Sequence, residues 1–295
     1  MLLITGITGH TGGFFLKELI KQNYEHPIKC IVRENSNTTL LDNSPLNIQK
    51  ITGDIRDVDF LNECMEGVTT VFHIVNIRHT IPILKTAINH NVDRFISVHT
   101  TGIYSNFRKA SEEYIQIENK IKVLTSTSKV KVTIIRPTMI FGDLHDRNMS
   151  RFIKMIDRYK VFPVIGGGKS LIQPVNARDL GKAYFQILSL NSSQVRFEYI
   201  LSGDKPITMK EAFNYIGRFL NKKTLYINVP AWLGVGGAKF AYWISLRRIN
   251  YIEQVQRMTE SRAFSHELAK LDFGYKPESF ELGIKREVTE FIEKG

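Results

Sequence analysis

Three glycines near the amino terminus have the spacing needed to hold a phosphate group. Gly6, Gly9 and Gly12 follow an apolar run and recur at every third position. The first glycine permits a sharp turn, the second lets the backbone approach a pyrophosphate, and the third lets the next helix pack closely on the strand. A helix over residues 14–21 would aim its unpaired N–H groups at the phosphates. The pattern therefore predicts a dinucleotide-binding turn between a strand and a helix.

The residue after the next apolar run bears on which dinucleotide binds. Residues 28–32 are expected to form a buried strand, and Arg33 comes directly after it. An acidic side chain here would bind the ribose 2′-hydroxyl of NAD, whereas a basic one accommodates the 2′-phosphate of NADP. We predict that NADP(H) is preferred and that NAD(H) is the second choice. The alternative is that Arg33 is a solvent-facing loop residue.

Strand and helix patterns alternate along the first half of the chain. After residues 28–32, strands are expected at residues 47–51, 69–74, 94–98 and 130–135, with helices up to about residue 65 and over residues 81–91 and 108–126. Asp57 is placed to cap the first of these helices. Such alternation is typical of right-handed βαβ crossovers, so it predicts a doubly wound parallel sheet.

The alternation fades in the second half, where the expected elements are shorter. They are helices near residues 151–159, 179–190, 208–220, 230–246, 265–271 and 279–293, and strands near residues 171–175 and 197–201. We predict an α/β protein with a Rossmann fold over residues 1–142 and a smaller C-terminal α/β substrate lobe over residues 143–295. Residues 170–201 are expected to return from that lobe to the sheet.

The charge of the chain is unevenly distributed. The net charge is +11, and residues 143–295 hold 24 Lys and Arg against 16 Asp and Glu, a difference of +8. Acidic ligands would be attracted to this part. The basic residues are scattered, so a solvated surface is the competing interpretation, and no motif points to nucleic acid. We expect an unidentified small-molecule substrate and no nucleic-acid partner.

Residues 231–246 are apolar apart from Lys239, Ser245 and the glycines. A membrane-spanning helix needs about 20 apolar residues, so this stretch is too short to span. A buried helix or a substrate lid is the favoured interpretation. Arg247 and Arg248, which follow the stretch, keep a peripheral membrane contact as the second interpretation.

The two cysteines give little evidence of a chemical role. Cys30 and Cys64 do not have the spacing of metal ligands, and two unpaired thiols suit a reducing compartment. Met1 leads directly into the first expected strand, and glycines interrupt the apolar run before a signal peptide could form. We therefore expect no bound metal and a cytoplasmic location.

Four motifs in this order resemble the short-chain dehydrogenase/reductase superfamily, in its extended or atypical branch. Residues 5–12 match the TGxxGxxG loop of that branch, and residues 53–57 are similar to its adenine-contacting segment. Residues 73–76 resemble its H-L-A-A run, and residues 136–142 resemble its RPxxVYG segment. The branch includes NAD-dependent epimerases and dehydratases and the NmrA-like proteins.

The resemblance implies where a cofactor would lie. It places Asp54 beside the adenine amino group and the pair Arg136-Pro137 over the nicotinamide end. Together with the glycine turn and Arg33, the predicted cofactor-binding residues are Gly6, Thr8, Gly9, His10, Thr11, Gly12, Arg33, Asp54, Ile55, Ile74, Val75, Asn76, Arg136 and Pro137.

The chemistry of the family uses a Ser or Thr, a Tyr, and a Lys four residues after that Tyr. By resemblance, the segment at residues 98–104 supplies the first hydroxyl, and its register favours Thr100. The nearby tyrosine is Tyr114, but Glu118 stands four residues later. A carboxylate one helical turn away would raise the pKa of the phenol, which opposes proton transfer near neutral pH. Thr100 and Tyr114 are therefore the candidate catalytic residues, without the lysine.

A second register follows from spacing back from the Arg136-Pro137 pair. It aligns Glu118 with an acidic position that follows the family's Lys, so Tyr114 takes the Lys position and Ala110 the Tyr position. Neither register restores the Tyr-Lys pair. Lys120 does not replace the lysine, because six residues along a helix turn it to a different face from Tyr114.

Two interpretations remain open. The first is an atypical reductase, or an epimerase- or dehydratase-like enzyme, on a carbonyl or nucleotide-linked substrate, with a proton from Thr100, His99, Tyr104 or a water. The second is a non-catalytic NAD(P)H-binding protein whose occupancy regulates a partner. A homodimer is compatible with both. Loss of the Tyr-Lys pair predicts no sugar-nucleotide 4-epimerase activity of the usual kind.

Overall fold

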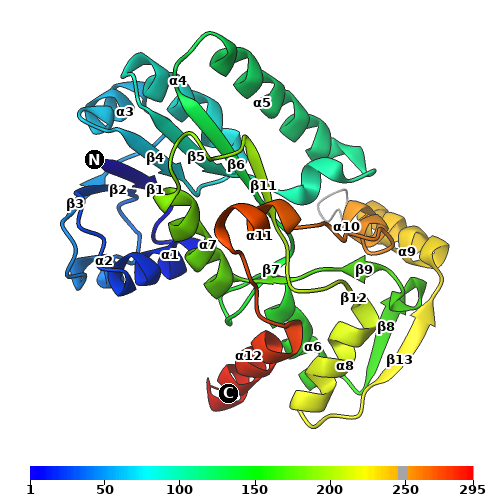
Figure 1. The fold of residues 1–295 in the computed structure, drawn as a ribbon. Coiled ribbons are helices and arrows are strands. Elements are labelled where there is room, and N and C mark those ends of the chain that lie inside the picture. The colour runs from blue at the N-terminus through cyan, green and yellow to red at the C-terminus, as the bar shows by residue number, and fades with distance from the viewer. Residues whose placement is uncertain (245–251, 295) are drawn as a thin grey trace.

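The computed structural model describes residues 1–244 and 252–294, and its centre is one parallel sheet (Figure 1). Within this part of the chain the sheet has seven strands in the order β11-β6-β5-β4-β1-β2-β3. The strands are β1 Leu2–Thr5, β2 Ile28–Val32, β3 Ile48–Thr52, β4 Thr70–His73, β5 Arg94–Val98, β6 Lys131–Pro137 and β11 Glu198–Leu201. The order reverses direction between β1 and β4, which confirms the predicted doubly wound sheet.

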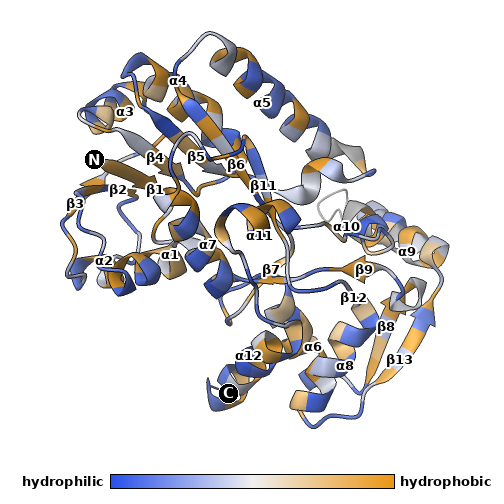
Figure 2. Cartoon of the chain, viewed as in Figure 1, coloured by the Kyte–Doolittle hydropathy of each residue, from blue (hydrophilic) through white to orange (hydrophobic). Residues whose placement is uncertain are grey.

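Helices cover both faces of the sheet. They are α1 His10–Lys21 and α7 Ala177–Ser189 on one face, and α3 Val58–Met65, α4 Thr80–Asn89 and α5 Arg108–Ser126 on the other (Figure 1). Leu2 and Ile4 of β1 join the apolar cluster under α1 and α7, whereas Leu3 joins the cluster on the opposite face. Alternate residues of β1 are therefore buried in two separate cores. Figure 2 shows orange and blue alternating along α5, as expected for a helix with one solvated face.

Local polar contacts fix where α3 begins and ends. The Asp57 carboxylate accepts hydrogen bonds from the N–H groups of Asp59 and Phe60, so the predicted cap is confirmed. At the other end, the Lys29 ammonium donates to the carbonyl oxygens of Cys64 (3.2 Å) and Glu66 (2.8 Å). Lys29 lies in the buried strand β2, and these bonds satisfy its charge.

A second lobe follows β6 and encloses its own apolar cluster. Its elements are β7 Ile140–Phe141, α6 Met149–Arg158, β8 Val161–Ile165, β9 Leu171–Ile172, β10 Val175–Asn176, β12 Ile207–Thr208, α8 Met209–Phe219, β13 Leu225–Val229 and α12 Phe280–Lys294. Three two-stranded ladders join β7 with β10, β9 with β12, and β8 with β13. The Thr-x-x-Glu spacing at residues 208–211 predicts a capping box, and α8 has one.

The strand expected over residues 171–175 is wrong as a single element. β9 and β10 are two short strands in different ladders, and Pro174 stands between them. Proline has no N–H to continue a ladder, so the chain changes partner at this residue. After this change, α7 packs on one face of the main sheet and β11 pairs with β6 at its edge.

Seven further elements complete the described chain. They are α2 Thr39–Asp42, η1 Ile77–His79, η2 Thr101–Tyr104, η3 Gly166–Gly168, α9 Ala231–Ile244, α10 Ile252–Arg257 and α11 Glu267–Phe273. The pair Arg247-Arg248, cited above for a membrane contact, lies outside the described residues. No helix in the described ranges is long and apolar enough to cross a membrane.

Candidate functional site

The glycine turn between β1 and α1 requires glycine at two positions, one because of its backbone conformation and one because of close packing. Gly6 has φ of +81°, a conformation that residues with a side chain rarely adopt. A Cβ on Gly12 would lie 2.2 Å from the carbonyl oxygen of Gly6, so α1 packs on the turn only with glycine there. A Cβ on Gly9 would lie 3.2 Å from the same oxygen. Gly9 is thus less constrained by the protein itself, and its predicted role toward a pyrophosphate remains a prediction.

The N-terminus of α1 is open to an anion. Gly9 is the N-cap residue, no side chain caps the helix, and its first turn has no acidic residue. The first N–H groups of a helix lack partners within the helix, and the helix dipole favours negative charge there. This end of α1 therefore fits a diphosphate group.

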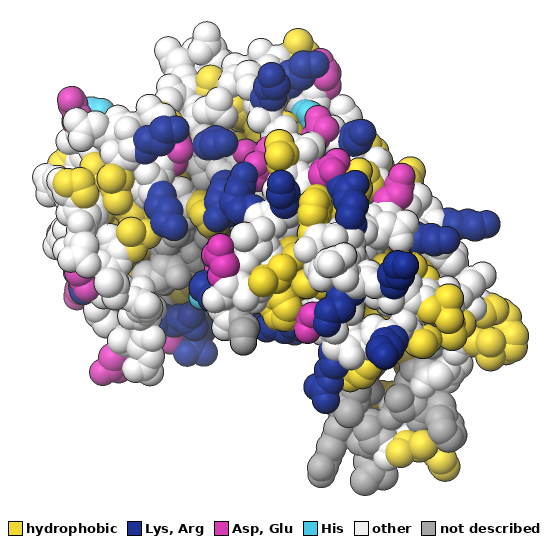
Figure 3. Space-filling view, turned by 90° about the horizontal axis from the view of Figure 1, so that it is seen from below, with side chains coloured by type: hydrophobic (Ala, Val, Ile, Leu, Met, Phe, Trp, Pro, Cys, Tyr) yellow, Lys and Arg dark blue, Asp and Glu magenta, His cyan; other side chains and the backbone are white. Residues whose placement is uncertain are grey.

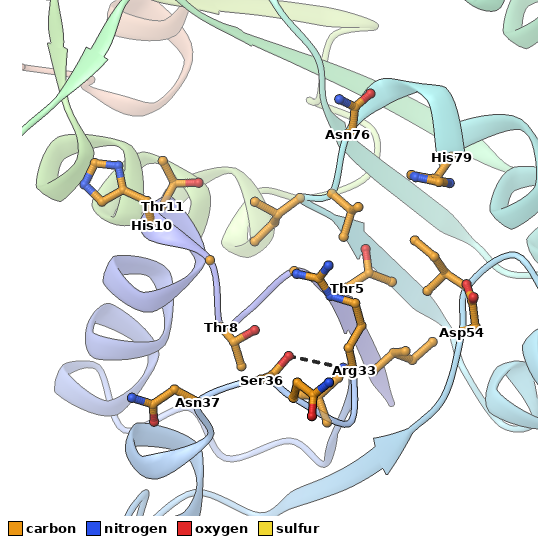
Figure 4. Close-up of a pocket in the computed structure, with 18 of the residues that line it drawn as sticks. Thr5, Thr8, His10, Thr11, Arg33, Ser36, Asn37, Asp54, Asn76 and His79 are labelled. Atoms are coloured by element: carbon orange, nitrogen blue, oxygen red, sulfur yellow. Dashed lines mark hydrogen bonds between the residues drawn. The ribbon is translucent and has the colours of Figure 1, made fainter. Parts of the chain in front are cut away.

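A groove of about 1550 Å³ runs over this turn along the carboxyl ends of β1, β2 and β4 (Figure 4). The predicted cofactor-binding residues that line it are Gly6, Thr8, Gly9, His10, Thr11, Arg33, Asp54, Ile55, Ile74, Val75 and Asn76. Gly12, Arg136 and Pro137 do not line it. Ligands of doubly wound proteins bind at this switch point of the sheet, so the groove has the expected place for a dinucleotide.

Arg33 and Asp54 stand at the edge of the groove formed by β2 and β3. Figure 4 shows the Arg33 side chain extending into the groove toward Thr5, while its N–H donates to the Ser36 hydroxyl (3.3 Å). Among the described residues no carboxylate pairs with the Arg33 guanidinium. Asp54, in contrast, accepts from the side chain and the backbone N–H of Arg56, and these bonds lower the pKa of Asp54 to about 2.

Beyond β4, the chain forms the opposite side of the groove. Val75 packs against the glycine turn, since a Cβ on Gly6 would lie 3.0 Å from its side chain. The Asn76 side chain accepts from the N–H of Arg78 (3.1 Å) and caps η1. His73 is fully buried with Nδ1 2.7 Å from the Thr5 hydroxyl, and burial lowers its pKa to about 3. His73 is therefore neutral and joins β4 to β1.

The outer wall of the groove comes from the second lobe, which the sequence motifs did not indicate. His145, Asp146, Arg147 and Asn148 line it. A contact joins this wall to the glycine turn, because His10 Nε2 lies 3.1 Å from the Asp143 carboxylate. Burial alone would raise the pKa of Asp143, but the His10 contact outweighs it and the pKa falls to about 2.

The candidate catalytic residues lie near the same edge of the sheet without lining the groove. Thr100 follows β5, and its hydroxyl oxygen accepts from the N–H of Gly102 (3.0 Å), which leaves the hydroxyl proton available to a ligand. Tyr114 lies on α5, with its ring centre 5.6 Å from the guanidinium carbon of Arg78. Arg78 in turn forms a two-point ion pair with Glu113.

Glu118 does not act on Tyr114 as expected, because its carboxylate is held by β6. Arg136 donates to both Glu118 oxygens, one bond being 2.7 Å, and His99 Nδ1 lies 2.9 Å from it. Burial opposes ionisation of Glu118, but these partners prevail and lower its pKa to about 2. Arg136 also pairs with Glu198 (2.9 Å), so Arg136 is enclosed and its predicted contact with a nicotinamide remains a prediction.

Two of the other proton sources named above differ in exposure. His99 is buried in the Glu118–Arg136 cluster, and burial lowers its pKa despite the neighbouring carboxylate. Tyr104 is 45% exposed, and partial burial raises the pKa of its phenol although Arg136 opposes this. Tyr104 therefore keeps its proton at neutral pH and is accessible to a ligand.

A segment of the second lobe closes over the loop after β5. The Glu260 carboxylate accepts from the Ser105 hydroxyl (2.8 Å) and the N–H of Asn106 (2.7 Å), and the Phe264 ring lies against Tyr104. Sequence patterns gave no indication of this contact, because it joins residues more than 150 positions apart. The described residues contain no group of His, Cys, Asp and Glu able to hold a metal ion.

A glycine turn and an open helix N-terminus at the switch point of a doubly wound sheet define a dinucleotide-binding Rossmann protein. The NAD(P)H-binding family model matches residues 6–155. The chain belongs to this family. Its relatives below include a short-chain dehydrogenase/reductase, in line with the resemblance to the atypical branch.

Known proteins with this fold resemble the whole chain. Mouse (Mus musculus) short-chain dehydrogenase/reductase family 42E member 1 is 23% identical, over 85% of this chain and 78% of its own. The structure of UDP-glucuronic acid 4-epimerase from Bacillus cereus, with UDP-glucuronic acid and NAD, has a TM-score of 0.78 at 14% identity, over 100% and 99% of the two chains. The dTDP-glucose 4,6-dehydratase from Streptomyces venezuelae, with NAD bound, has a TM-score of 0.74 at 18% identity, over 99% and 97%. These likenesses support a nicotinamide cofactor and an enzyme in general.

Proposed function

We propose that the protein is an NADP(H)-dependent oxidoreductase that reduces a carbonyl group of a small molecule. The observation that carries the proposal is the Arg33 guanidinium, which has no carboxylate partner among the described residues, in a groove built on the glycine turn. A guanidinium recognises a phosphate through charge-assisted hydrogen bonds, and the cofactor that adds a phosphate at this place is NADP(H). Glu34 also lines the groove. However, the residue directly after β2, where cofactor preference is set, is Arg33 and not Glu34.

The residues of this chain divide the work as follows. The N–H groups at the start of α1 would hold the diphosphate, and Arg33 would hold the 2′-phosphate. NADPH held in this way would supply a hydride for the carbonyl carbon. Thr100 donates its hydroxyl proton in a hydrogen bond that orients the carbonyl oxygen, and Tyr104 transfers a proton to that oxygen. The exposure of the Tyr104 side chain supports this assignment.

A substrate panel tests this function. NADPH loss at 340 nm is followed with quinones, aldehydes and ketones, and epimer formation from UDP- and dTDP-sugars is followed by chromatography. We expect NADPH loss with a carbonyl substrate, reduced about 10²–10⁴-fold in Tyr104→Phe and reduced in Thr100→Ala. We expect no epimer, because Tyr114 has no lysine partner. Tyr159→Phe, an exposed tyrosine of the second lobe, is the matched control. Epimer formation, or full activity of both variants, would contradict the proposal.

A second candidate is a non-catalytic protein whose NADP(H) occupancy regulates a partner. The observation that favours it is the enclosure of Glu118, His99 and Arg136 in one buried cluster, which ties up the nearby charged groups. Tight NADPH binding without any turnover in the panel would support this candidate over the reductase. A nucleotide-linked substrate, as in the structural neighbours, is the second substrate class, and a dehydration or reduction product from the sugar nucleotides would support it.

A further inference from the structure

Helix α9 exposes an apolar face that no other described element covers. Trp232 and Trp243 are 72% and 74% exposed, and Leu233 and Ile244 are 48% and 60% exposed. These residues recur at helical spacing on one face of α9. Ala238 on the opposite face is buried. Lone exposed apolar residues are common, but two largely exposed tryptophans on one helix face mark an interaction surface.

The ladder of β8 and β13 extends this apolar surface. Val161, Leu225 and Ile227 are 48%, 64% and 49% exposed, while the alternate residues Phe162 and Val164 face the core of the lobe. Val161 and Leu225 are paired neighbours in the ladder. Helix α9 lies against the other end of this ladder, because a Cβ on Gly234 would lie 3.3 Å from Ile165. We refer to the exposed residues of α9, β8 and β13 together as the α9 surface.

The charges around the α9 surface are mainly positive, although Lys222 pairs with Asp157 (2.9 Å). Lys160, Lys222 and Lys223 cluster where β8 and β13 begin, and Lys239 is exposed on α9. In the sequence, residues 221–252 contain five Lys and Arg, namely Lys222, Lys223, Lys239, Arg247 and Arg248, and no Asp or Glu. Figure 3 shows Lys and Arg side chains beside hydrophobic ones on this side of the molecule.

We propose that the α9 surface docks on a lipid bilayer that contains anionic lipids. Tryptophan prefers the boundary between lipid headgroups and acyl chains, and lysines beside it are attracted to anionic headgroups. α9 is too short to span a bilayer, so it would lie in the plane of the interface. A second copy of the chain fits less well, because a symmetric contact would bring the same lysines together.

Docking would place the candidate site near the lipid. Val255 of α10 packs close to Gly234 of α9, and Glu260 just beyond α10 binds the loop after β5. The same stretch of chain thus contacts both helix α9 and the segment that contains Thr100 and Tyr104. The docking proposal does not depend on NADP(H) turnover, so its test uses binding alone.

The two tryptophans of the chain make the test direct, because both lie on α9. Intrinsic tryptophan emission of the full chain is recorded with vesicles of phosphatidylcholine and phosphatidylglycerol, and co-sedimentation gives the bound fraction. We expect a shift to shorter wavelength and binding that weakens several-fold on vesicles of phosphatidylcholine alone. The double variant Leu233→Gln/Ile244→Gln keeps both tryptophans and should bind about tenfold more weakly or worse.

Two further variants make the result specific. Lys160→Glu/Lys223→Glu should weaken binding to the anionic vesicles and leave binding to phosphatidylcholine unchanged. Val123→Gln/Leu271→Gln alters two residues that are 70% and 69% exposed on α5 and α11, and it should bind like the unmodified chain. The proposal is overturned if vesicles leave the emission unchanged, or if Leu233→Gln/Ile244→Gln binds normally. It is also overturned if the emission shifts with protein concentration without lipid, since a second copy then covers the surface.

Discussion

The glycine turn and the loop after β5 lie at the same edge of the sheet, but polar groups are unpaired at the turn and paired behind the loop. At the turn, the N–H groups at the start of α1 have no side-chain cap, and the Arg33 guanidinium has no carboxylate partner among the described residues. Behind the loop, Glu118 and Arg136 satisfy each other in a buried cluster. The turn therefore presents unpaired hydrogen-bond donors to a ligand. In the cluster, the donors of Arg136 are already bonded to Glu118.

This difference indicates which part of the protein is built for binding and which for stability. Buried charges are costly unless they are paired, so removal of one partner in the cluster should destabilise the fold. Exposed donors cost little when unpaired, so changes at the turn should affect the ligand more than the fold. Substitutions at the two places should therefore separate ligand affinity from stability.

The largest effect is expected for Gly9→Val. Its side chain would occupy the space that a pyrophosphate needs at the start of α1, so NADPH binding should be lost, while the midpoint of thermal unfolding changes much less. Gly13→Val is the matched control, because a Cβ on Gly13 meets no atom within 4 Å. Normal NADPH binding by folded Gly9→Val would show that the turn does not hold a dinucleotide.

Arg136→Leu should have the largest effect on stability. It would leave Glu118 buried without its main partner, which costs about 3–5 kcal/mol in the free energy of unfolding. Arg33→Ala should change the same free energy by less than about 0.5 kcal/mol, since Arg33 is exposed. Urea denaturation of both variants measures the difference. Equal losses of unfolding free energy in Arg136→Leu and Arg33→Ala would contradict the assignment of the cluster to stability and of the turn to binding.

A smaller effect is expected from pH. The pKa of Glu118 is about 2 in the folded chain, against about 4.3 in an unfolded one, so the folded state favours its ionised form. This contribution, about 3 kcal/mol, is complete above pH 5 and is lost as the pH falls toward 2. The difference in unfolding free energy between the unmodified chain and Glu118→Gln should therefore shrink over that range. Glu290→Gln, in an exposed pair with Lys294, is the control and should differ by less than about 1 kcal/mol. A difference that stays constant with pH would contradict the role of the cluster.

The sequence predicted the elements that depend on neighbouring residues. The sheet topology, the Asp57 cap and the Thr-x-x-Glu capping box were confirmed, because each depends on residues a few positions apart or on regular periodicity. The glycine spacing also indicated the turn at which the groove lies. Pro174 is a local indication that residues 171–175 form two short strands rather than one.

Other parts of the site depend on contacts between distant residues. The direction of the Glu118 side chain is set by Arg136 on a neighbouring strand, and helical spacing relates Glu118 only to Tyr114. The hydrogen bond from the Asn106 N–H to Glu260 joins the second lobe to the loop after β5. Residues 145–148, also in the second lobe, form a wall of the groove. None of these has a sequence pattern of its own, so the three-dimensional arrangement was needed to find them.

The central claim is that an open guanidinium at the groove selects NADP(H), and a paired titration tests it most directly. NADPH and NADH are titrated by their fluorescence into the unmodified chain, Arg33→Ala and Arg33→Lys. A charge-assisted contact predicts a preference for NADPH of roughly 10- to 100-fold, lost in Arg33→Ala and largely kept in Arg33→Lys. Equal affinities in the unmodified chain, or an unchanged preference in Arg33→Ala, would contradict the account.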